Sequence, residues 1–528
     1  MRLFQASVIA LFAVSSTLPI AGLAQSGDAG ALLSKHAAFT GFVGGATQAT
    51  WQATGTRTGD RGASDRFDEA RSGLVYRDTI STPQNVSDSV GYSGRAVWHA
   101  DANGFTAAVM GAPRQAAIDF DIVRSETLAA LGTTAITGSA DVGGTACTIV
   151  RATPNGGTPM DLYVDPRSGA FLRVVVDPTG TPTTFDGLQY GAAGAGKRAI
   201  DAWTVDGHTY ALTSIDAKPT VPDTLLAPPP QTATWTFSSQ TSPVIYATEN
   251  DNNRQVKVTA SVNGRTGVFL LDTTTPSILL YEPFAGQAGV TNMGSSDFSP
   301  YVGNIQYGGY ARAATVAIGS NVLHNVIVET MYSRNAQIAG ILGYDFLAGA
   351  IVNVDLKQRT LQLLDPSIYA AQTAPGGYAF PVDLTDRTPS IAMRLPRGGA
   401  AFPSLDTGLS GFLLLSQGLS DRREIEGIPI EDTSTIGFGG QGASSDPIAT
   451  TGTTITYTAW NSASTSGSCI TVKQMQIGPY TYTNPEACFG GTNVFGQDRG
   501  LIGMDFLRHF NWTIDYPDAS FVVNPNGE

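Results

Sequence analysis

Apolar and polar residues alternate in short segments along much of the chain, and turn-forming residues separate these segments. Residues 161–164 and 171–176 are two such segments, joined by the sequence Asp-Pro-Arg-Ser-Gly. An alternation with a period of two is typical of strands that bury one face, and Pro followed by Gly favours a hairpin turn. One amphipathic helix is expected around residues 115–131. The pattern predicts a mainly β protein whose first unit, residues 25–220, is an antiparallel sheet.

A connector is expected near the middle of the chain. Residues 228–230 are three consecutive prolines, and Gln, Thr and Ser residues follow them. Proline cannot donate to a strand ladder or continue a helix, so such a segment is typical of a junction between domains. We therefore expect a linker over residues 221–242 and a new globular unit from Pro243 onward.

The second unit contains an internal repeat. Each copy begins with a β-hairpin, and in the first copy Asn263-Gly264 favours a tight turn between two apolar strands. Each hairpin ends in an Asp-Thr pair, and the pattern Gly-apolar-apolar-Gly-x-Asp-Phe-Leu follows later. The repeated segments are Asp272-Thr273-Thr274 with residues 340–347, and Asp406-Thr407-Gly408 with residues 500–507. The second copy is longer, by an insertion that we place in region 430–468.

These repeated features resemble the pepsin and retropepsin family of aspartic proteases, in particular its bacterial retropepsin-like members. The resemblance covers about residues 243–525. It implies a bilobal double β-barrel, with lobes at residues 243–385 and 386–528, preceded in this chain by an antiparallel half-barrel domain. In that family each lobe presents Asp-Thr-Gly on a loop crossed by a strand that ends in glycine, here Gly343 and Gly503.

The resemblance also implies which residues do the chemistry. It assigns Asp272 and Asp406 as the catalytic pair. The hydroxyls of Thr273 and Thr407 would lock the two loops together, and Asp345 and Asp505 would stabilise the short helix after each crossing strand. Two carboxylates a few ångströms apart share one proton, because both cannot ionise easily. The ionised member takes a proton from a water held between them, and the protonated member polarises the scissile carbonyl. The implied function is an aspartic endopeptidase that acts on a polypeptide in the cleft between its lobes and needs no cofactor.

Other catalytic constellations are not indicated. The five His show no pair at metal-ligand spacing and the three Cys form no Cys-x-x-Cys motif, so no metal site is predicted. Neither a Gly-x-Ser-x-Gly elbow nor a phosphate-binding loop occurs in the required context. Because one chain holds both Asp-Thr copies, a monomer is sufficient for a complete pair.

The first copy departs from the family pattern at Thr274, where the family has glycine. Glycine allows a tight turn and leaves its amide close to the carboxylate, whereas a β-branched residue resists positive φ and adds bulk beside the water site. Two hypotheses follow. In the first, Thr274 is tolerated with a negative φ and the protease is active. In the second, the chain is a noncatalytic peptide- or protein-binding relative, because its first loop no longer holds Asp272 in working geometry.

The family closes its cleft with a β-hairpin flap that often carries a tyrosine. In the first copy the candidate flap is residues 301–319, with Gly308-Gly309 at its tip and Tyr307 or Tyr310 pointing into the cleft. The glycine-rich residues 437–442 occupy the equivalent place in the second copy. An ordinary surface hairpin is the alternative interpretation of both segments.

Short segments of the first unit, such as residues 94–104 and 162–169, resemble the half-barrel sheets of outer-membrane lipoprotein carriers. That resemblance implies a concave apolar sheet that holds a lipid tail, a peptide or a neighbouring domain. A sheet that only packs against the protease unit is the alternative. A third hypothesis for the chain therefore places its main function in this sheet, as a lipid or lipoprotein carrier.

Composition and charge indicate where the protein is located and which class of partner is not expected. The 528 residues include 31 basic and 44 acidic side chains, a formal charge of −13, so nucleic acid is not an expected partner. Residues 1–24 combine one Arg, an apolar stretch and small residues near the end, which is typical of a cleavable secretory signal. No later stretch is long and apolar enough to predict a transmembrane segment. We therefore expect a periplasmic or secreted protein.

The cysteines are consistent with export. Cys469 and Cys488 lie close enough in the sequence to close one loop, and an oxidising compartment permits a disulfide between them. Cys147 lies far from both in the sequence. We therefore expect one disulfide and one unpaired cysteine.

Overall fold

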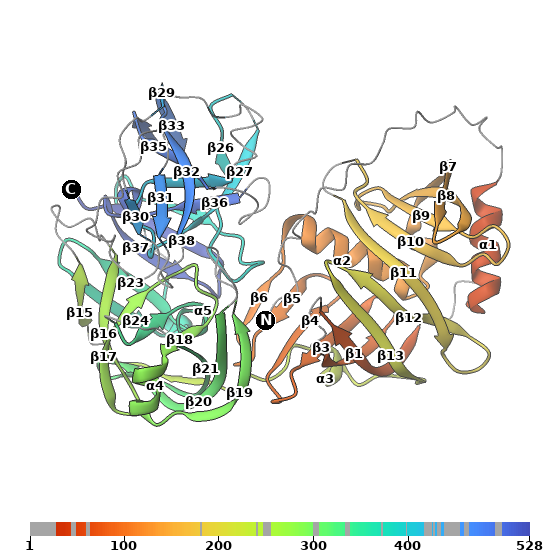
Figure 1. The fold of residues 1–528 in the computed structure, drawn as a ribbon, viewed down its shortest axis with the longest axis horizontal. Coiled ribbons are helices and arrows are strands. Elements are labelled where there is room, and N and C mark those ends of the chain that lie inside the picture. Colours follow the sequence, from red (N-terminus) through yellow and green to blue (C-terminus); the bar gives the residue numbers. More distant parts are fainter. Residues whose placement is uncertain are drawn as a thin grey trace. The chain divides into compact units, whose positions relative to one another are not determined.

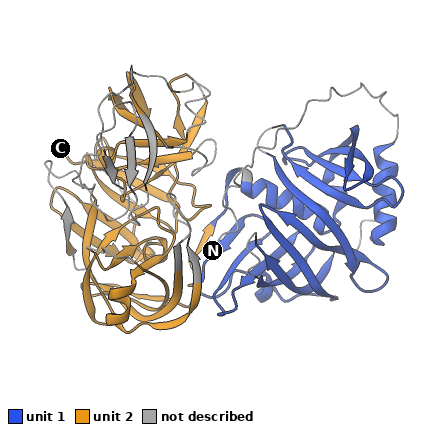
Figure 2. Cartoon of the chain, viewed as in Figure 1, with its two compact units in different colours: residues 1–102, 108–230 blue, residues 103–107, 231–528 orange. Residues whose placement is uncertain are grey.

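The structure is a computed structural model, and it describes residues 28–43, 49–59, 64–179, 182–238, 241–246, 255–298, 306–332, 338–370, 373–397, 399–416, 425, 428–429, 435–437, 455–458, 464–490 and 499–527. The chain forms two compact units (Figure 2). The first unit is Met1–Ala102 with Ala108–Pro230, and the second is Asn103–Ala107 with Gln231–Glu528. Across the described ranges, no helix is long and apolar enough to cross a membrane.

The first unit is built on one large antiparallel sheet (Figure 1). Its strands are β1 (Thr50–Thr58), β2 (Ser64–Ser72), β3 (Val75–Ser81), β4 (Ser87–Tyr92), β5 (Val97–Ala100), β7 (Thr133–Val142), β8 (Thr145–Thr153), β9 (Met160–Val164), β10 (Phe171–Val176), β11 (Thr183–Ala192), β12 (Arg198–Val205) and β13 (His208–Ala217). They lie in the order β5-β4-β3-β2-β1-β13-β12-β11-β10-β9-β8-β7, so the pairing of β1 with β13 joins two meanders. The short β6 (Thr106–Ala108) spans the boundary between the units.

In the described part of this unit, three α-helices and one 3-10 helix accompany the sheet. They are α1 (Ala29–Thr40), α2 (Gly111–Arg124), the 3-10 helix η1 (Leu128–Leu131) and α3 (Asp223–Leu226). The single helix expected over residues 115–131 is therefore α2 followed by η1. The sequence pattern did not predict α1, because its alanine-rich segment has no strong apolar periodicity.

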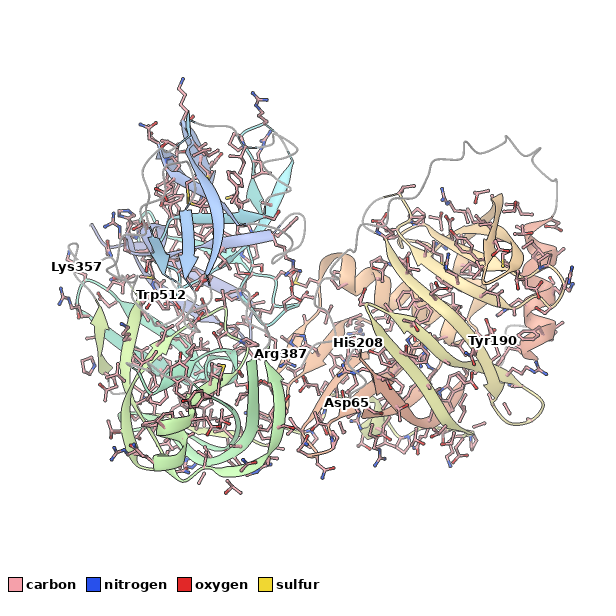
Figure 3. All side chains as sticks on the ribbon, in the orientation of Figure 1. Asp65, Tyr190, His208, Lys357, Arg387 and Trp512 are labelled. Atoms are coloured by element: carbon pink, nitrogen blue, oxygen red, sulfur yellow. A yellow bond between two sulfur atoms is a disulfide. The ribbon has the colours of Figure 1, made fainter. Side chains whose placement is uncertain are left out.

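A buried histidine attaches α1 to the rest of the first unit. The Nδ1 atom of His36 donates a 2.9 Å hydrogen bond to the carbonyl of Gly169, and its Nε2 lies 3.2 Å from the carboxylate of Glu126. The ring stacks on Phe171 with centroids 3.6 Å apart, and it meets the edge of Tyr190 (labelled in Figure 3). The position of α1 therefore depends on contacts more than 80 residues away in sequence, such as the 3.1 Å bond from Thr40 to Glu126.

A network of five buried charged side chains connects α2 to strands β2 and β3. On β2, Nε of Arg71 lies 2.5 Å from Glu69, and Arg71 also pairs with Asp121 on α2. Arg124 on α2 lies 2.5 Å from Glu69 and 3.2 Å from Asp78 on β3. Three carboxylates thus share two guanidinium groups. Burial raises the pKa of Asp78 to about 7 and that of Asp121 to about 6, although both arginines oppose this effect.

The first lobe of the second unit contains a closed barrel (green in Figure 1). Its elements are β14 (Thr234–Thr236), β15 (Thr241–Tyr246), β16 (Val256–Val262), β17 (Arg265–Leu271), β18 (Ile278–Tyr281), α4 (Glu282–Ala288), β19 (Thr291–Phe298), β20 (Gln306–Ile318), β21 (Asn321–Met331), β22 (Gly340–Leu342), α5 (Tyr344–Leu347), β23 (Ile351–Asp355), β24 (Thr360–Leu364) and the 3-10 helix η2 (Pro366–Ile368). Strands β16, β17, β22, β18, β21 and β20 pair in this order, and β20 pairs with β16 to close the circle.

Among the described residues, the largest sheet specific to the second lobe is open, whereas the first lobe has a closed barrel. The elements are β25 (Tyr378–Pro381), β26 (Met393–Arg394), β27 (Ala400–Leu405), β28 (Leu413–Ser416), β29 (Ile428–Pro429), β30 (Thr435–Gly437), β31 (Ile455–Thr458), β32 (Ser464–Thr471), β33 (Gln474–Ile477), β34 (Tyr480–Thr483), β35 (Glu486–Gly490), β36 (Arg499–Ile502), α7 (Met504–Leu507), β37 (Phe510–Asp515) and β38 (Ser520–Pro525). Strands β26, β27, β36, β28, β35, β32, β31 and β30 lie in this order. The prediction of a mainly β protein is confirmed. The predicted double barrel is confirmed in part, because the first lobe contains a closed barrel.

A shared sheet joins the two lobes within the second unit. Its order is β15-β24-β23-β37-β38-β25, and β23 of the first copy pairs antiparallel with β37 of the second. Strand β25, which falls within residues 243–385, pairs with β38 of the second lobe. The two copies therefore fold as one unit with a continuous apolar core.

Two segments outside residues 243–528 also belong to the second unit. Strand β14, which lies within the expected linker, pairs with β21. The side-chain amide of Asn103 donates to the carbonyl of Ile327 on β21 at 3.1 Å, and its oxygen accepts from the same residue's amide at 2.7 Å. Phe105 is buried in the core of this unit. A short segment from the first half of the chain thus completes the first lobe.

The second lobe contains the expected disulfide. Cys469 on β32 and Cys488 on β35 are directly opposed in an antiparallel pair, and a disulfide joins them. Cys147 on β8 is buried and unpaired.

We expect one thiol per chain to react with an alkylating reagent after denaturation, and three after reduction, because only Cys147 is outside the disulfide. Mass spectrometry of the alkylated chain measures both numbers. Reduction is expected to destabilise the lobe by about 3 kcal/mol, given the 19-residue separation of the two cysteines. Three alkylated cysteines without reduction would contradict the pairing.

Candidate active site

The first candidate loop leaves the barrel at Asp272, directly after β17. Strand β22 lies between β17 and β18, parallel to the former and antiparallel to the latter. The amide of Asp272 donates to the carbonyl of Leu342 at 3.1 Å, so the last residue of β22 holds the start of the loop. The chain then passes Gly343 into α5. The crossing strand therefore fixes where Asp272 begins its loop.

The second copy repeats this arrangement. Strand β36 lies between β27 and β28, again parallel to the first and antiparallel to the second. The amide of Asp406 donates to the carbonyl of Ile502 at 2.8 Å. The chain then passes Gly503 into α7. Two segments that are distant in sequence thus present an aspartate in the same local setting.

Gly343 and Gly503 are required by close backbone contact. A Cβ atom at Gly343 would overlap the carbonyl oxygen of Thr275, and one at Gly503 would overlap that of Gly411. The residue after each glycine bonds the loop as well: the amide of Tyr344 donates to Thr275 at 2.8 Å, and that of Met504 donates to Leu409 at 2.7 Å. Backbone atoms cannot rotate away, so both positions accept only glycine.

Thr273 and Thr407 join the two loops through crossed hydrogen bonds. The amide of each threonine donates to the hydroxyl of the other at 3.2 Å. The Thr273 hydroxyl donates to the carbonyl of Leu405 at 2.5 Å, and the Thr407 hydroxyl donates to that of Leu271 at 2.7 Å. Both threonines are fully buried. These four bonds hold two loops that are 134 residues apart in sequence against each other.

Asp272 accepts hydrogen bonds from three donors on its own loop. The amide and the hydroxyl of Thr274 both donate to Oδ1 at 2.8 Å. The hydroxyl of Thr275 donates to Oδ2 at 2.9 Å. Donors of this kind favour the ionised form of a carboxyl group. These three hydrogen bonds fix the orientation of the Asp272 carboxyl group.

Asp406 lies close to Asp272, and its carboxyl group is buried beside that of Asp272. Burial and the charge of Asp272 raise its pKa well above the usual range, although the amides of Gly408 and Leu409 and the hydroxyl of Thr274 oppose the shift. A point at the Cβ position of Gly408 lies 2.9 Å from Oδ2 of Asp272 and 3.1 Å from Oδ1 of Asp406. Both carboxyl groups, which are buried, thus face one small space.

Thr274 does not disturb this geometry through its backbone. Neither Thr274 nor Gly408 is among the described residues with a positive φ. The glycine of the family pattern is therefore not needed here for its conformational freedom. The side chain of Thr274 is buried and its hydroxyl bonds to Asp272, so the loop contains an additional donor.

The sequence did not assign roles to several residues around the pair. A comparison of the two copies indicates Thr275, because it has a hydroxyl at the position where the second copy has Leu409. Gln255 is buried and donates to the carbonyl of Gly408 at 2.7 Å, but it precedes the repeat and no motif indicates it. Tyr281 and Tyr516 are buried, and both desolvation and the charge of Asp272 raise their pKa above the usual range. They face the pair as neutral phenols.

The expected flap is placed differently in the structure. Gly308 and Gly309 lie within β20 and pair with β19 on one side and β21 on the other, so they are not a hairpin tip. Two adjacent glycines indicated a turn, but both adopt extended backbone in a ladder. Residues 299–305, between β19 and β20, lie outside the described residues, as do residues 438–442 of the second candidate flap.

The structure describes the side chain of one of the two candidate flap tyrosines. Tyr310 on β20 is buried and pairs with Gly294 and Glu329. Tyr307 lies on the same strand, and the position of its side chain is outside the description.

Among the described residues, one group of side chains has the spacing of metal ligands, namely Cys469, Glu486 and Cys488. The two sulfurs of this group form the disulfide. Cysteine binds a metal ion as a thiolate, and the two cysteines of this group are oxidised to a disulfide. The group is therefore not suited to binding a metal ion. Asp345 and Asp505 lie in the first turns of α5 and α7, and Asp505 is 3.8 Å from Arg508.

A family model matches the part of the chain that contains the first loop. Residues 258–346 match the family model described as aspartyl protease. A solved DUF1329 family protein from Desulfovibrio piger is similar to 38% of this chain over 96% of its own length, with 14% identity and a TM-score of 0.28. No curated protein matches the chain. The matched residues include β17, Asp272 and the crossing strand β22, and they form an aspartyl protease family domain.

Proposed function

We propose that the second unit is an aspartic endopeptidase in which Asp272 and Asp406 activate one water. The observation that carries this proposal is the convergence of two buried carboxyl groups on one space, from loops joined by four crossed threonine hydrogen bonds.

The two carboxyl groups have distinct roles in the proposed reaction. The Asp272 carboxylate takes a proton from the water as its oxygen bonds to the scissile carbonyl carbon. Asp406 gives its proton to the carbonyl oxygen, which yields a tetrahedral diol. As the diol collapses, one of its hydroxyls returns a proton to Asp406, the carbon–nitrogen bond breaks, and the proton held on Asp272 passes to the leaving amine. The products are a carboxyl group and an amine, and the pair retains one proton in total.

The test is cleavage of a peptide mixture in water enriched in oxygen-18, from acid to neutral pH. A water nucleophile places one heavy oxygen in each new carboxyl terminus, which mass spectrometry detects. The expected result is new termini that carry this label and appear with the folded chain. A folded chain that cleaves nothing at any pH would overturn the proposal and favour the noncatalytic binding relative.

We also propose that the protein acts outside the cytoplasm. The pattern of residues 1–24 supports this location, and the disulfide between Cys469 and Cys488 is of the kind that persists in oxidising compartments. Fractionation of cells that express the full chain, with the N-terminus of the recovered protein sequenced, tests both parts of this proposal.

Alanine at Gly408 is expected to lower peptide cleavage by about 10²-fold. The new Cβ would lie 2.9 Å from the Asp272 carboxylate, which must then move from its position opposite Asp406. The measurement is kcat/KM on a peptide that the wild-type chain cleaves. Gly286→Ala is the matched control, because a Cβ atom there meets nothing within 4 Å and its backbone has no positive φ. Equal activity of the two variants would contradict the predicted crowding.

A further inference from the structure

The Thr274 hydroxyl donates a hydrogen bond to one carboxyl group of the pair. It donates to Oδ1 of Asp272 at 2.8 Å, and its hydrogen bonding also lowers the pKa of Asp406. The side chain is buried, with 5% of its residue surface exposed. Water therefore competes little for this hydroxyl, and its hydrogen bonds are strengthened by the low local dielectric.

The second loop has no such group. At the equivalent position, Gly408 contributes its amide to Asp406 at 2.7 Å, and it has no side chain. One residue further along, Thr275 donates to Asp272 where the second loop has Leu409. The two loops are therefore equivalent in their backbone but unequal in their hydroxyl donors.

Among the described residues, two tyrosines outside the loops interact with the charge of Asp272. Burial and the charge of Asp272 raise the pKa of Tyr281 on β18 and of Tyr516 after β37 above the usual value for tyrosine. Tyr516 packs edge-on against Tyr344 of α5. The charge that acts on Asp406 is that of Asp272. The protonation of the pair therefore depends on the two carboxyl groups and on the donors around them.

We propose that Thr274 is a positioning residue that moves the working pH range of the aspartate pair toward acid. This inference rests on the proposed function, because it concerns the range in which the pair holds one proton. A donor stabilises a carboxylate more than the neutral acid, so each proton of the pair is lost at a lower pH when the hydroxyl is present. Both limbs of the activity profile then lie at lower pH than they would with glycine at this position.

Three variants separate the hydroxyl from the bulk of the side chain. Thr274→Val keeps the shape and removes the hydroxyl, Thr274→Gly removes both, and Thr274→Ser keeps the hydroxyl. The measurement is the pH dependence of kcat/KM for peptide cleavage. We expect both limbs to move up by about one pH unit in the Val and Gly variants, and the Ser variant to keep the wild-type limbs. Equal profiles for wild type and Thr274→Val would overturn the proposal, as would a shift in the Ser variant equal to that of Gly.

A second readout does not require activity. Infrared difference titration follows the protonated carboxyl band that is lost in Asp406→Asn. Its midpoint is expected to be about one pH unit higher in Thr274→Val than in the wild type, and unchanged in Thr274→Ser. An unmoved midpoint in the Val variant overturns the role of Thr274. If the wild type cleaves no peptide but the midpoint moves, the proposed function fails while the effect of Thr274 on the pair stands.

Discussion

Asparagine at either Asp272 or Asp406 is expected to lower kcat for peptide cleavage by at least about 10³-fold. General acid–base catalysis by a positioned side chain contributes about 10² to 10⁴ in rate, and here both members of one proton-sharing pair are needed. Asparagine has nearly the shape of aspartate, so the crossed threonine bonds between the loops are expected to remain. Single-turnover cleavage of a peptide identified with the wild-type chain measures the loss.

The matched control is Asp518→Asn. Asp518 is exposed in the turn between β37 and β38, and the substitution makes the same chemical change away from the pair. Its activity is expected to equal that of the wild type. Because the two carboxyl groups act as a unit, the double variant of the pair is expected to be hardly worse than either single variant. Full activity in Asp272→Asn or Asp406→Asn would exclude the paired-carboxylate mechanism.

Methionine at Arg71 is expected to destabilise the first unit by about 3 to 5 kcal/mol. The guanidinium of Arg71 is fully buried and pairs with Glu69 and Asp121, so its removal leaves two buried carboxylates with one cation fewer. Methionine fills much of the same volume, so the loss is chiefly electrostatic. Denaturant unfolding of the full chain, read by hydrogen exchange in peptides that cover α2, measures it.

Arg66 on the same strand supplies the control for this prediction. Its side chain is 68% exposed and pairs with Asp68, so water screens the interaction. Arg66→Met is therefore expected to leave hydrogen exchange in α2 near the wild-type level. If Arg71→Met is equally harmless, then the buried network does not hold α2 on the sheet.

The sequence by itself determined the local elements around the site. Asn263-Gly264 forms the turn between β16 and β17, with both residues at positive φ, because this pair suits a tight hairpin. The repeated Asp-Thr segments lie at the ends of β17 and β27, and the later glycines lie where the crossing strands leave them. These features depend on contiguous residues with strong turn or strand preferences. Neighbouring residues are enough to specify them.

Only the tertiary structure decided which residues surround the aspartate pair and how closely its two carboxyl groups approach. Thr275 and Gln255 gained their contacts because segments far apart in sequence meet there. Gly308 and Gly309 became part of a strand because β19 and β21 supply partners on both sides. The effect of Thr274 depends on the closeness and burial of both carboxyl groups. Desolvation and charge proximity arise from packing between distant segments, and a linear pattern does not contain them.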